Sequence, residues 1–176
     1  MTEEPAADEC VFCAVVAHRA EASIVVEDET VVVWMDLHPL TRGHLLVVPR
    51  RHAVGLDDLD AATGAHVWSV AHEMARALRR STLGCPGINV VVCDGEAASQ
   101  TVFHLHVHVI PRYPGDGLGV PFAVEALERE KSLRDGDARV IRAALARAGE
   151  GVAPSPAHGH AGTPTTSGRT VPPLTP

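Results

Sequence analysis

The sequence predicts an α+β domain built on an antiparallel β-sheet with two main helices. Strand-like segments outnumber helical ones, and they lack the strict alternation with helices that a parallel sheet requires. Helical periodicity is confined to residues 60–80 and to a segment around residues 138–148. We expect one domain over residues 1–149. Residues 150–176 are rich in Pro, Thr, Ser and Gly, and we expect them to be disordered.

The segments before residue 50 predict a short helical turn followed by three strands. "CVFCAVVAHRA", residues 10–20, favours the helical turn. "SIVVEDETVVVWMD", residues 23–36, contains two strand-like runs around an acidic turn, which predicts a hairpin. "GHLLVVP", residues 43–49, is a third strand, and Pro49 stops it because proline has no N–H to give to the ladder.

A long amphipathic helix is expected after these strands. Asp60 is a suitable N-cap and Gly84 a suitable stop for the helix. Between them the apolar residues recur every three to four positions, at Val67, Val70, Met74 and Leu78.

The last two predicted strands are "INVVVCDG", residues 88–95, and "FHLHVHVIPR", residues 103–112. A short polar loop joins them, so we expect antiparallel neighbours. Period two in the second strand directs three histidines to one face and Leu105, Val107 and Val109 to the other. Pro111 is expected to end the strand.

The three histidines of that strand cannot all bind one metal ion. At about 3.3 Å per residue, His104 and His108 would lie about 13 Å apart along an extended strand. Zinc binds imidazole nitrogen at about 2 Å, so both rings cannot reach the same ion. The rings must therefore serve at least two purposes.

Composition restricts the class of protein. A chain of 176 residues with 45% hydrophobic content can bury one core. The net charge of −7 argues against a nucleic-acid partner, and the apolar runs are too short to span a membrane. The acidic N-terminus lacks an apolar signal segment, so we expect a cytoplasmic protein. In that compartment the four cysteines favour metal binding or free thiols over disulfides.

Two segments carry a resemblance to a known family. "QTVFHLHVHVIPR" resembles the signature of the histidine triad (HIT) family, and "DLHPLTRGHLLVVPRRH" is similar to that family's first-half motif. The likeness covers roughly residues 10–112. It implies a HIT-like fold, a small-molecule nucleotide substrate and a homodimer. It also implies cleavage at the α-phosphate of a nucleotide, through attack by the middle histidine and a nucleotidyl-histidine intermediate.

The resemblance assigns a role to individual residues. It makes His106 the nucleophile, with His108 and His44 as flanking rings. The remaining residues that it implies are Gln100 and Thr101 at the phosphate and leaving group, Asp36 at the ribose hydroxyls, and Leu37 and Phe12 as walls for the base. Taken without the resemblance, Asp36 could equally cap a turn before Pro39.

The phosphate loop departs from the family pattern at two positions. Cys93 stands where relatives usually carry an amide, and Ser99 stands where many have glycine. Because a thiol is a weak hydrogen-bond donor, one phosphate contact is either missing or supplied by Asn89.

"CVFC" gives Cys10 and Cys13 the spacing of zinc ligands, but two ligands do not complete a site. A thioredoxin-like redox pair is the alternative for the same spacing. Some bacterial members of the HIT family resemble this sequence and complete a zinc site with residues that correspond to His52 and His104. The resemblance therefore implies a structural zinc ion, because four protein ligands leave no open position.

We expect a hydrolase that acts on phosphoramidates or dinucleoside polyphosphates of nucleosides and releases the nucleoside monophosphate. Two alternatives stay open. One is a nucleotide-binding regulatory module with little turnover, which the altered loop at Cys93 and Ser99 favours. The other is a phosphorylase-like nucleotidyl transferase, in which phosphate replaces water.

Overall fold

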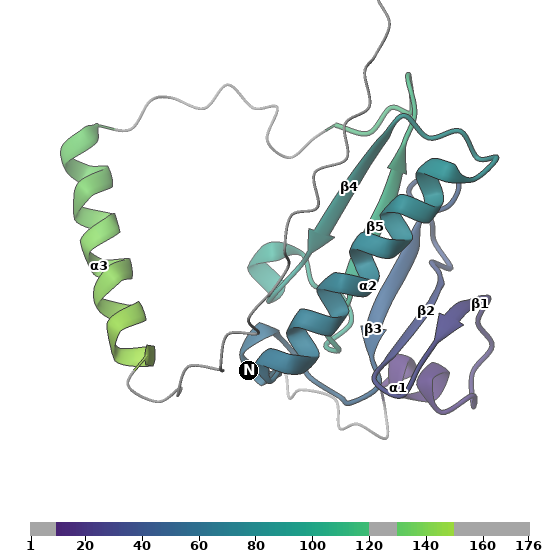
Figure 1. Cartoon of the computed structure of the whole chain (residues 1–176), viewed down its shortest axis with the longest axis horizontal. Helices are drawn as coiled ribbons and strands as arrows, with labels where there is room; N and C mark the ends of the chain where they lie inside the picture. Colours follow the sequence, from purple (N-terminus) through teal and green to yellow (C-terminus); the bar gives the residue numbers. More distant parts are fainter. Residues whose placement is uncertain (1–9, 120–129, 150–176) are drawn as a thin grey trace, which may run out of the picture. The chain divides into compact units, whose positions relative to one another are not determined.

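The structure is a computed structural model, and it describes residues 10–119 and 130–149. The chain divides into two units, residues 1–121 and 122–176, which are considered separately. The first unit contains every strand among the described residues (Figure 1). In the second unit the described part is one helix, α3, Lys131–Gly149, which includes the predicted segment 138–148. The predicted tail, 150–176, lies outside the described residues, and the boundary at residue 149 stays a prediction.

Five antiparallel strands form one sheet in the order β1-β2-β3-β5-β4. The strands are β1 Ile24–Glu27, β2 Val31–Met35, β3 Leu45–Pro49, β4 Gly87–Val92 and β5 Val107–Arg112. The predicted hairpin is β1–β2, and the predicted neighbours β4 and β5 pair antiparallel along their whole length. The expected α+β class with an antiparallel sheet is confirmed. Short 3₁₀ turns at Leu56–Asp58 (η1) and Glu96–Ala98 (η2) lie in the loops.

The long helix α2, Ala61–Arg80, begins directly after the predicted N-cap Asp60 and ends at Arg80, as the periodicity over residues 60–80 predicts. Asp60 is its N-cap, and its Oδ1 accepts a hydrogen bond from Thr63 N at 2.9 Å. The C-cap is Ser81, whose hydroxyl donates to Leu78 O at 2.7 Å. Ser81, rather than the expected Gly84, therefore caps the helix directly after Arg80.

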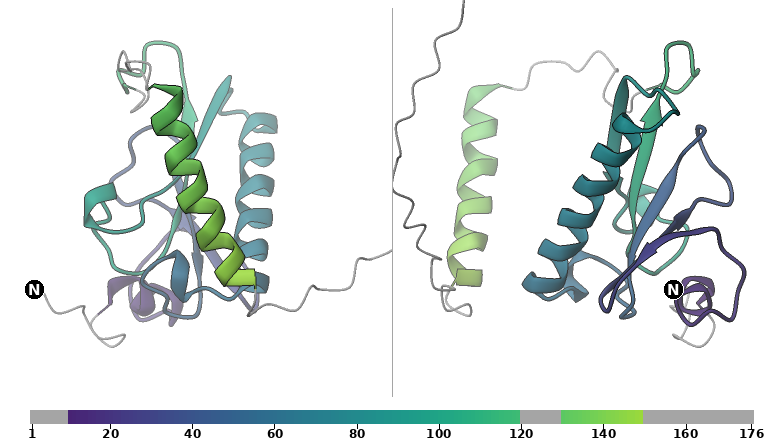
Figure 2. Two further views of the ribbon diagram at one scale, coloured as in Figure 1. Left: turned by 90° about the vertical axis from the view of Figure 1, so that its left-hand side faces the viewer. Right: turned by 45° about the vertical axis from the view of Figure 1, so that its right-hand side comes forward.

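Helices cover both faces of the sheet (Figure 2). Val31 and Val33 of β2 pack with α2 in one apolar cluster. Val32 and Trp34, the alternate residues of the same strand, pack on the other face with the short helix α1, Val11–Val16. Among the described residues, no helix combines the length and apolar character needed to cross a bilayer.

The predicted histidine strand is wrong at its start, and Pro111 does not end it. The strand begins at Val107, so His104 and His106 lie in the segment before it, and Pro111 lies inside it. The ladder with β3 starts at Val47 and Val107, and Pro49 two residues further along β3 has no N–H to continue it. Leu105 N instead donates to Ala53 O at 2.6 Å.

Candidate functional site

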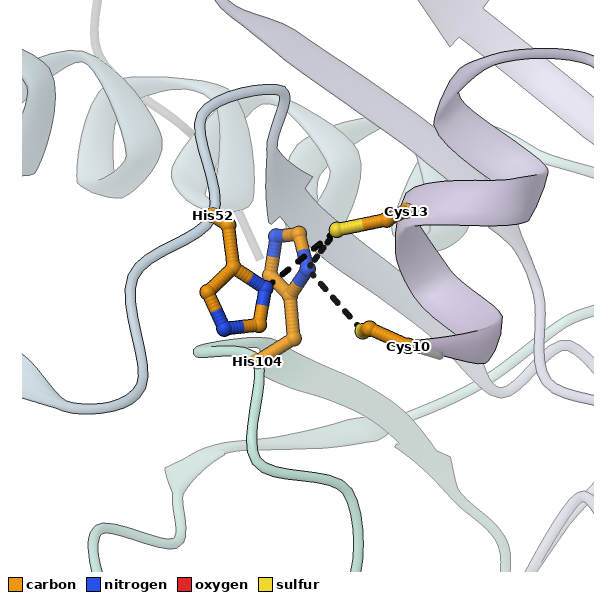
Figure 3. Close-up of side chains that lie close together, drawn as sticks. All are labelled: Cys10, Cys13, His52 and His104. Carbon is orange, nitrogen blue, oxygen red and sulfur yellow. Dashed lines mark hydrogen bonds between the residues drawn. The ribbon is translucent and has the colours of Figure 1, made fainter. Parts of the chain in front are cut away.

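Four predicted ligands meet on the α1 face of the sheet and form what we call the Cys/His cluster: Cys10, Cys13, His52 and His104 (Figure 3). The two cysteines come from the start of α1, because C-x-x-C spacing sets both thiols on one side of its first turn. His52 follows β3, and His104 precedes β5. Segments separated by up to 94 residues are thus joined at one point.

The donor atoms of the Cys/His cluster have the spacing of a tetrahedral metal site. Cys10 Sγ and Cys13 Sγ both lie 3.5 Å from His104 Nδ1, and Cys13 Sγ lies 3.2 Å from His52 Nδ1. All four donor atoms lie within 4.8 Å of one another. Tetrahedral zinc, with bonds of about 2.3 Å to sulfur and 2.0 Å to nitrogen, separates the two donors by about 3.5 Å. The cluster therefore fits a metal ion of that kind.

His104 is oriented as a metal ligand by its second nitrogen. Its Nε2 donates to Pro49 O at 2.8 Å, which leaves a lone pair on Nδ1, the nitrogen that faces the thiols. Burial lowers the pKa of His104 to about 4, so the ring is neutral at pH 7. Metals require this neutral form.

The alternative of a redox pair for Cys10 and Cys13 lacks the βαβ context of thioredoxin-like proteins, because the sheet is antiparallel.

A second group of side chains, which we call the triad cluster, lies beside the first and consists of Asp36, His44, His106 and His108. His106 is buried, and its Nδ1 donates to His104 O at 2.7 Å. This bond fixes the tautomer, so Nε2 carries the lone pair. A buried imidazole with one fixed donor and one bare nitrogen is equipped to act as a nucleophile.

His44 and His108 form a chain of hydrogen bonds with a definite direction. Leu40 N donates to His44 Nδ1 at 3.2 Å, so the proton of His44 is on Nε2. That Nε2 lies 3.0 Å from His108 Nδ1 and donates to it. The proton of His108 is then on its own Nε2. His108 can therefore donate a hydrogen bond to an anion, whereas His106 can only attack or accept one.

Burial holds the three histidines of the triad cluster in the neutral form. It lowers the pKa of His44 and His106, and it lowers that of His108 to about 4. The carboxylate of Asp36 opposes this shift and lies 3.4 Å from His44 Nδ1. The three rings are consequently uncharged at pH 7, as nucleophilic attack by imidazole requires.

A cavity of about 570 Å³ opens beside the triad cluster. Its lining is mostly apolar and includes Phe12, Trp34 and the exposed Leu37, with Asp36 among its polar residues. The Phe12 ring contacts Trp34 and His106 edge to face, with centroid distances of 5.2 and 5.1 Å. The predicted base walls Phe12 and Leu37 therefore share one cavity with the predicted ribose residue Asp36.

Asp36 performs the turn-capping role that the sequence left open. Its Oδ1 accepts a hydrogen bond from His38 N at 2.8 Å, in the turn before Pro39. Its other oxygen is the one near His44. The contact with ribose hydroxyls stays a prediction.

Two of the three residues expected at the phosphate form hydrogen bonds within the protein. Gln100 is buried, with Oε1 accepting from Gly95 N and Nε2 donating to Val54 O, both at 2.7 Å. Asn89 Oδ1 accepts from Arg112 at 2.6 Å, two positions along β4 from the partner of His108. Thr101 is exposed. These contacts give Gln100 and Asn89 structural roles, and their contact with phosphate stays a prediction.

The structure describes the backbone conformation of Ser99 and the burial of Cys93, the two residues that depart from the family pattern. Ser99 has a φ of 67°, in the left-handed region, which explains why glycine suits this position. Cys93 is half-buried directly after β4.

Sequence reasoning missed several groups around the site. Glu21 and Ser23 line the cavity, but nothing in their local sequence marks them. Leu40 N orients His44, and Pro49 O orients His104. These are backbone groups, which a sequence motif does not identify. Only the proline at residue 49 could have signalled the early end of the ladder.

Comparison with known proteins identifies the family. The HIT domain model matches residues 17–115. An uncharacterized HIT-like protein of Mycobacterium tuberculosis is 40% identical over 138 residues, which cover 78% of this chain and 94% of the relative. Adenylylsulfatase HINT3 of Arabidopsis thaliana is 30% identical over 140 residues, 80% of this chain and 69% of that protein.

A solved structure extends the similarity to the fold. The crystal structure of a Zn-bound histidine triad family protein from Mycobacterium smegmatis is 41% identical and superposes with a TM-score of 0.61, covering 82% of this chain and 99% of the other. With the family model, the relatives and the sheet in agreement, this chain belongs to the histidine triad family.

Proposed function

We propose that this protein hydrolyses nucleoside 5′-phosphate conjugates at the α-phosphate through a nucleotidyl-histidine intermediate. The observation that carries the proposal is the bare Nε2 of His106, held by the bond from Nδ1 to His104 O. The conjugates are phosphoramidates, dinucleoside polyphosphates or mixed anhydrides. The name of the adenylylsulfatase relative supports a substrate of this class.

The reaction has two displacements at phosphorus. In the first, the lone pair on His106 Nε2 forms a bond to the α-phosphorus, and the leaving group departs with its bonding electrons and takes a proton from water. In the second, water attacks the same phosphorus, the P–N bond breaks, and one proton is released with the nucleoside monophosphate. Throughout, the Nε2–H of His108 donates to a phosphoryl oxygen, where negative charge develops. His44 keeps His108 in that tautomer.

We assign one structural Zn²⁺ to the Cys/His cluster. Cys10, Cys13, His52 and His104 would hold the ion with two thiolates and two neutral imidazoles. The donor spacing supports this assignment, and so does the zinc-bound mycobacterial relative. When bound, the ion supplies stability rather than catalysis, because four protein ligands leave no position for water.

A nucleotide-binding module with little turnover is the second candidate, and one observation favours it. The Gln100 amide is already bonded to Gly95 N and Val54 O, and Cys93 is a weak donor, so this loop offers few groups to a phosphate. The phosphorylase-like transferase would use the same His106 and would differ only in the acceptor, which is phosphate in place of water.

Two further predictions concern assembly and location. The homodimer is predicted from the family resemblance, and the cytoplasmic location is predicted from the sequence.

Trapping the intermediate is the test of the proposal. Adenosine and guanosine phosphoramidates are mixed with the parent protein, with and without added phosphate, and quenched under conditions that preserve P–N bonds. We expect monophosphate release and an adduct on the peptide that contains His106. His106→Asn should abolish both and leave nucleotide binding nearly intact. His72→Asn, on the exposed side of α2, is the matched control and should be unchanged.

An adduct on another residue, or turnover that persists in His106→Asn, would overturn the mechanism. Binding without turnover in the parent would favour the module. Release of nucleoside diphosphate in place of monophosphate when phosphate is added would identify the transferase.

A further inference from the structure

One side of the cavity is formed by the segment between α1 and β1, and it carries one carboxylate. Glu21 lines the cavity together with Ala20, Ala22 and Ser23. Glu21 is exposed, and no hydrogen bond or ion pair joins its side chain to another described residue. Its two oxygens are therefore available to a bound molecule.

The small neighbours of Glu21 determine what can reach it. Ala20 and Ala22 have small side chains, so a planar ring held near Phe12 and Trp34 has space to extend toward the carboxylate. The face of such a ring packs on apolar side chains, which do not distinguish one base from another. Discrimination must come from the polar groups that meet its edge.

A carboxylate accepts hydrogen bonds and donates none. The hydroxyl of Ser23 both donates and accepts, so it does not discriminate between bases. Of the common bases, only guanine has two adjacent donors on its Watson–Crick edge, N1–H and the N2 amino group. Adenine and cytosine place one amino group beside a ring acceptor, and uracil flanks its single N–H with two carbonyls. A carboxylate can thus bond guanine with both oxygens.

We propose that Glu21 accepts hydrogen bonds from the edge of the base and gives this enzyme a preference for guanine nucleotides over adenine nucleotides. This inference rests on the proposed function, because it assumes that the cavity holds the base of the substrate. The bonds involve a charged acceptor at an exposed position, so we expect a preference of about tenfold.

Calorimetric binding of GMP, IMP, 1-methyl-GMP and AMP to the full chain tests the inference. IMP lacks the N2 amino group, and 1-methyl-GMP lacks N1–H, so each removes one proposed bond without changing the protein. We expect GMP to bind the parent most tightly, IMP and 1-methyl-GMP several-fold more weakly, and AMP about tenfold more weakly. In Glu21→Gln the preference for GMP over AMP should fall to about twofold or less, with AMP affinity little changed.

Glu29→Gln is the matched control, since Glu29 is an exposed glutamate in the β1–β2 turn that does not line the cavity. It should keep the parental order of affinities. Equal binding of GMP, IMP and AMP by the parent would overturn the inference and leave the proposed function intact. The same holds if Glu21→Gln keeps the full preference. Failure of all four nucleotides to bind would instead overturn the proposed function.

Discussion

The Cys/His cluster and the triad cluster use the same side chain for different purposes. His104 and His106 are two residues apart, both are buried, and both have one ring nitrogen bonded to a backbone carbonyl. In His104 the bonded nitrogen is Nε2, and the bare Nδ1 faces two thiols. In His106 the bonded nitrogen is Nδ1, and the bare Nε2 is left without a partner among the described residues.

This difference shows that the choice of nitrogen, rather than the presence of histidine, separates a ligand from a nucleophile. A lone pair surrounded by three other donor atoms favours a metal ion. A lone pair beside a cavity and a hydrogen-bond donor, as in His106 with His108, favours attack on a phosphorus atom. Variants that act on one cluster and spare the other test the distinction.

Removal of the metal should have the largest effect, and it should act on stability. In Cys13→Ala we expect the bound zinc to be lost and the unfolding free energy to fall by several kcal/mol, because binding energies at structural zinc sites reach about 10 kcal/mol. Elemental analysis and denaturant unfolding measure the two quantities. Cys93→Ala, outside the cluster, should keep one zinc per chain. A Cys13→Ala protein with parental zinc content would contradict the assignment.

Loss of the ribose contact should have a smaller effect, on binding alone. We expect Asp36→Ala to weaken binding of ribonucleotides by about 1.5 to 3 kcal/mol, the typical contribution of a charged hydrogen-bond partner. Calorimetry with ribo- and 2′-deoxynucleotides measures it. The parent should prefer the ribonucleotide and the variant should not. If the parent binds both equally and Asp36→Ala changes neither, the carboxylate serves only the turn with His38.

The smallest expected effect is a pH dependence of stability. The pKa of His108 is about 4 in the folded protein, whereas the ordinary pKa of histidine is 6.5, so between these two values the unfolded chain binds more protons. Stability should therefore be complete above pH 6.5 and decrease as the pH falls toward 4. His108→Asn should make this decrease less steep, because the unfolded and folded states of the variant should differ by up to about one bound proton less than those of the parent. Unfolding free energies measured from pH 4.5 to 7.5 would show it, and an unchanged slope would argue against a buried neutral His108.

Local chemistry made much of the fold predictable. Asp60 signals the start of α2, the acidic turn signals the β1–β2 hairpin, and C-x-x-C with the family resemblance indicates four residues that do meet. The errors arise from interactions between distant segments. Pro49 ends the ladder between β3 and β5, and the residues around this proline do not show which later strand it affects. The side-chain amide of Gln100 forms hydrogen bonds with Gly95 N and Val54 O. The family motif identifies Gln100 but does not show which groups it bonds.

The position of α1 links the two clusters thermodynamically. This six-residue helix is too short to be stable alone, and it carries Cys10 and Cys13 next to Phe12, which lines the cavity. Free energy that orders the cysteines therefore also orders a wall of the cavity. Such coupling is reciprocal: if the ion strengthens nucleotide binding by some factor, the nucleotide strengthens retention of the ion by the same factor. Metal supply would then set how tightly the cavity binds a nucleotide.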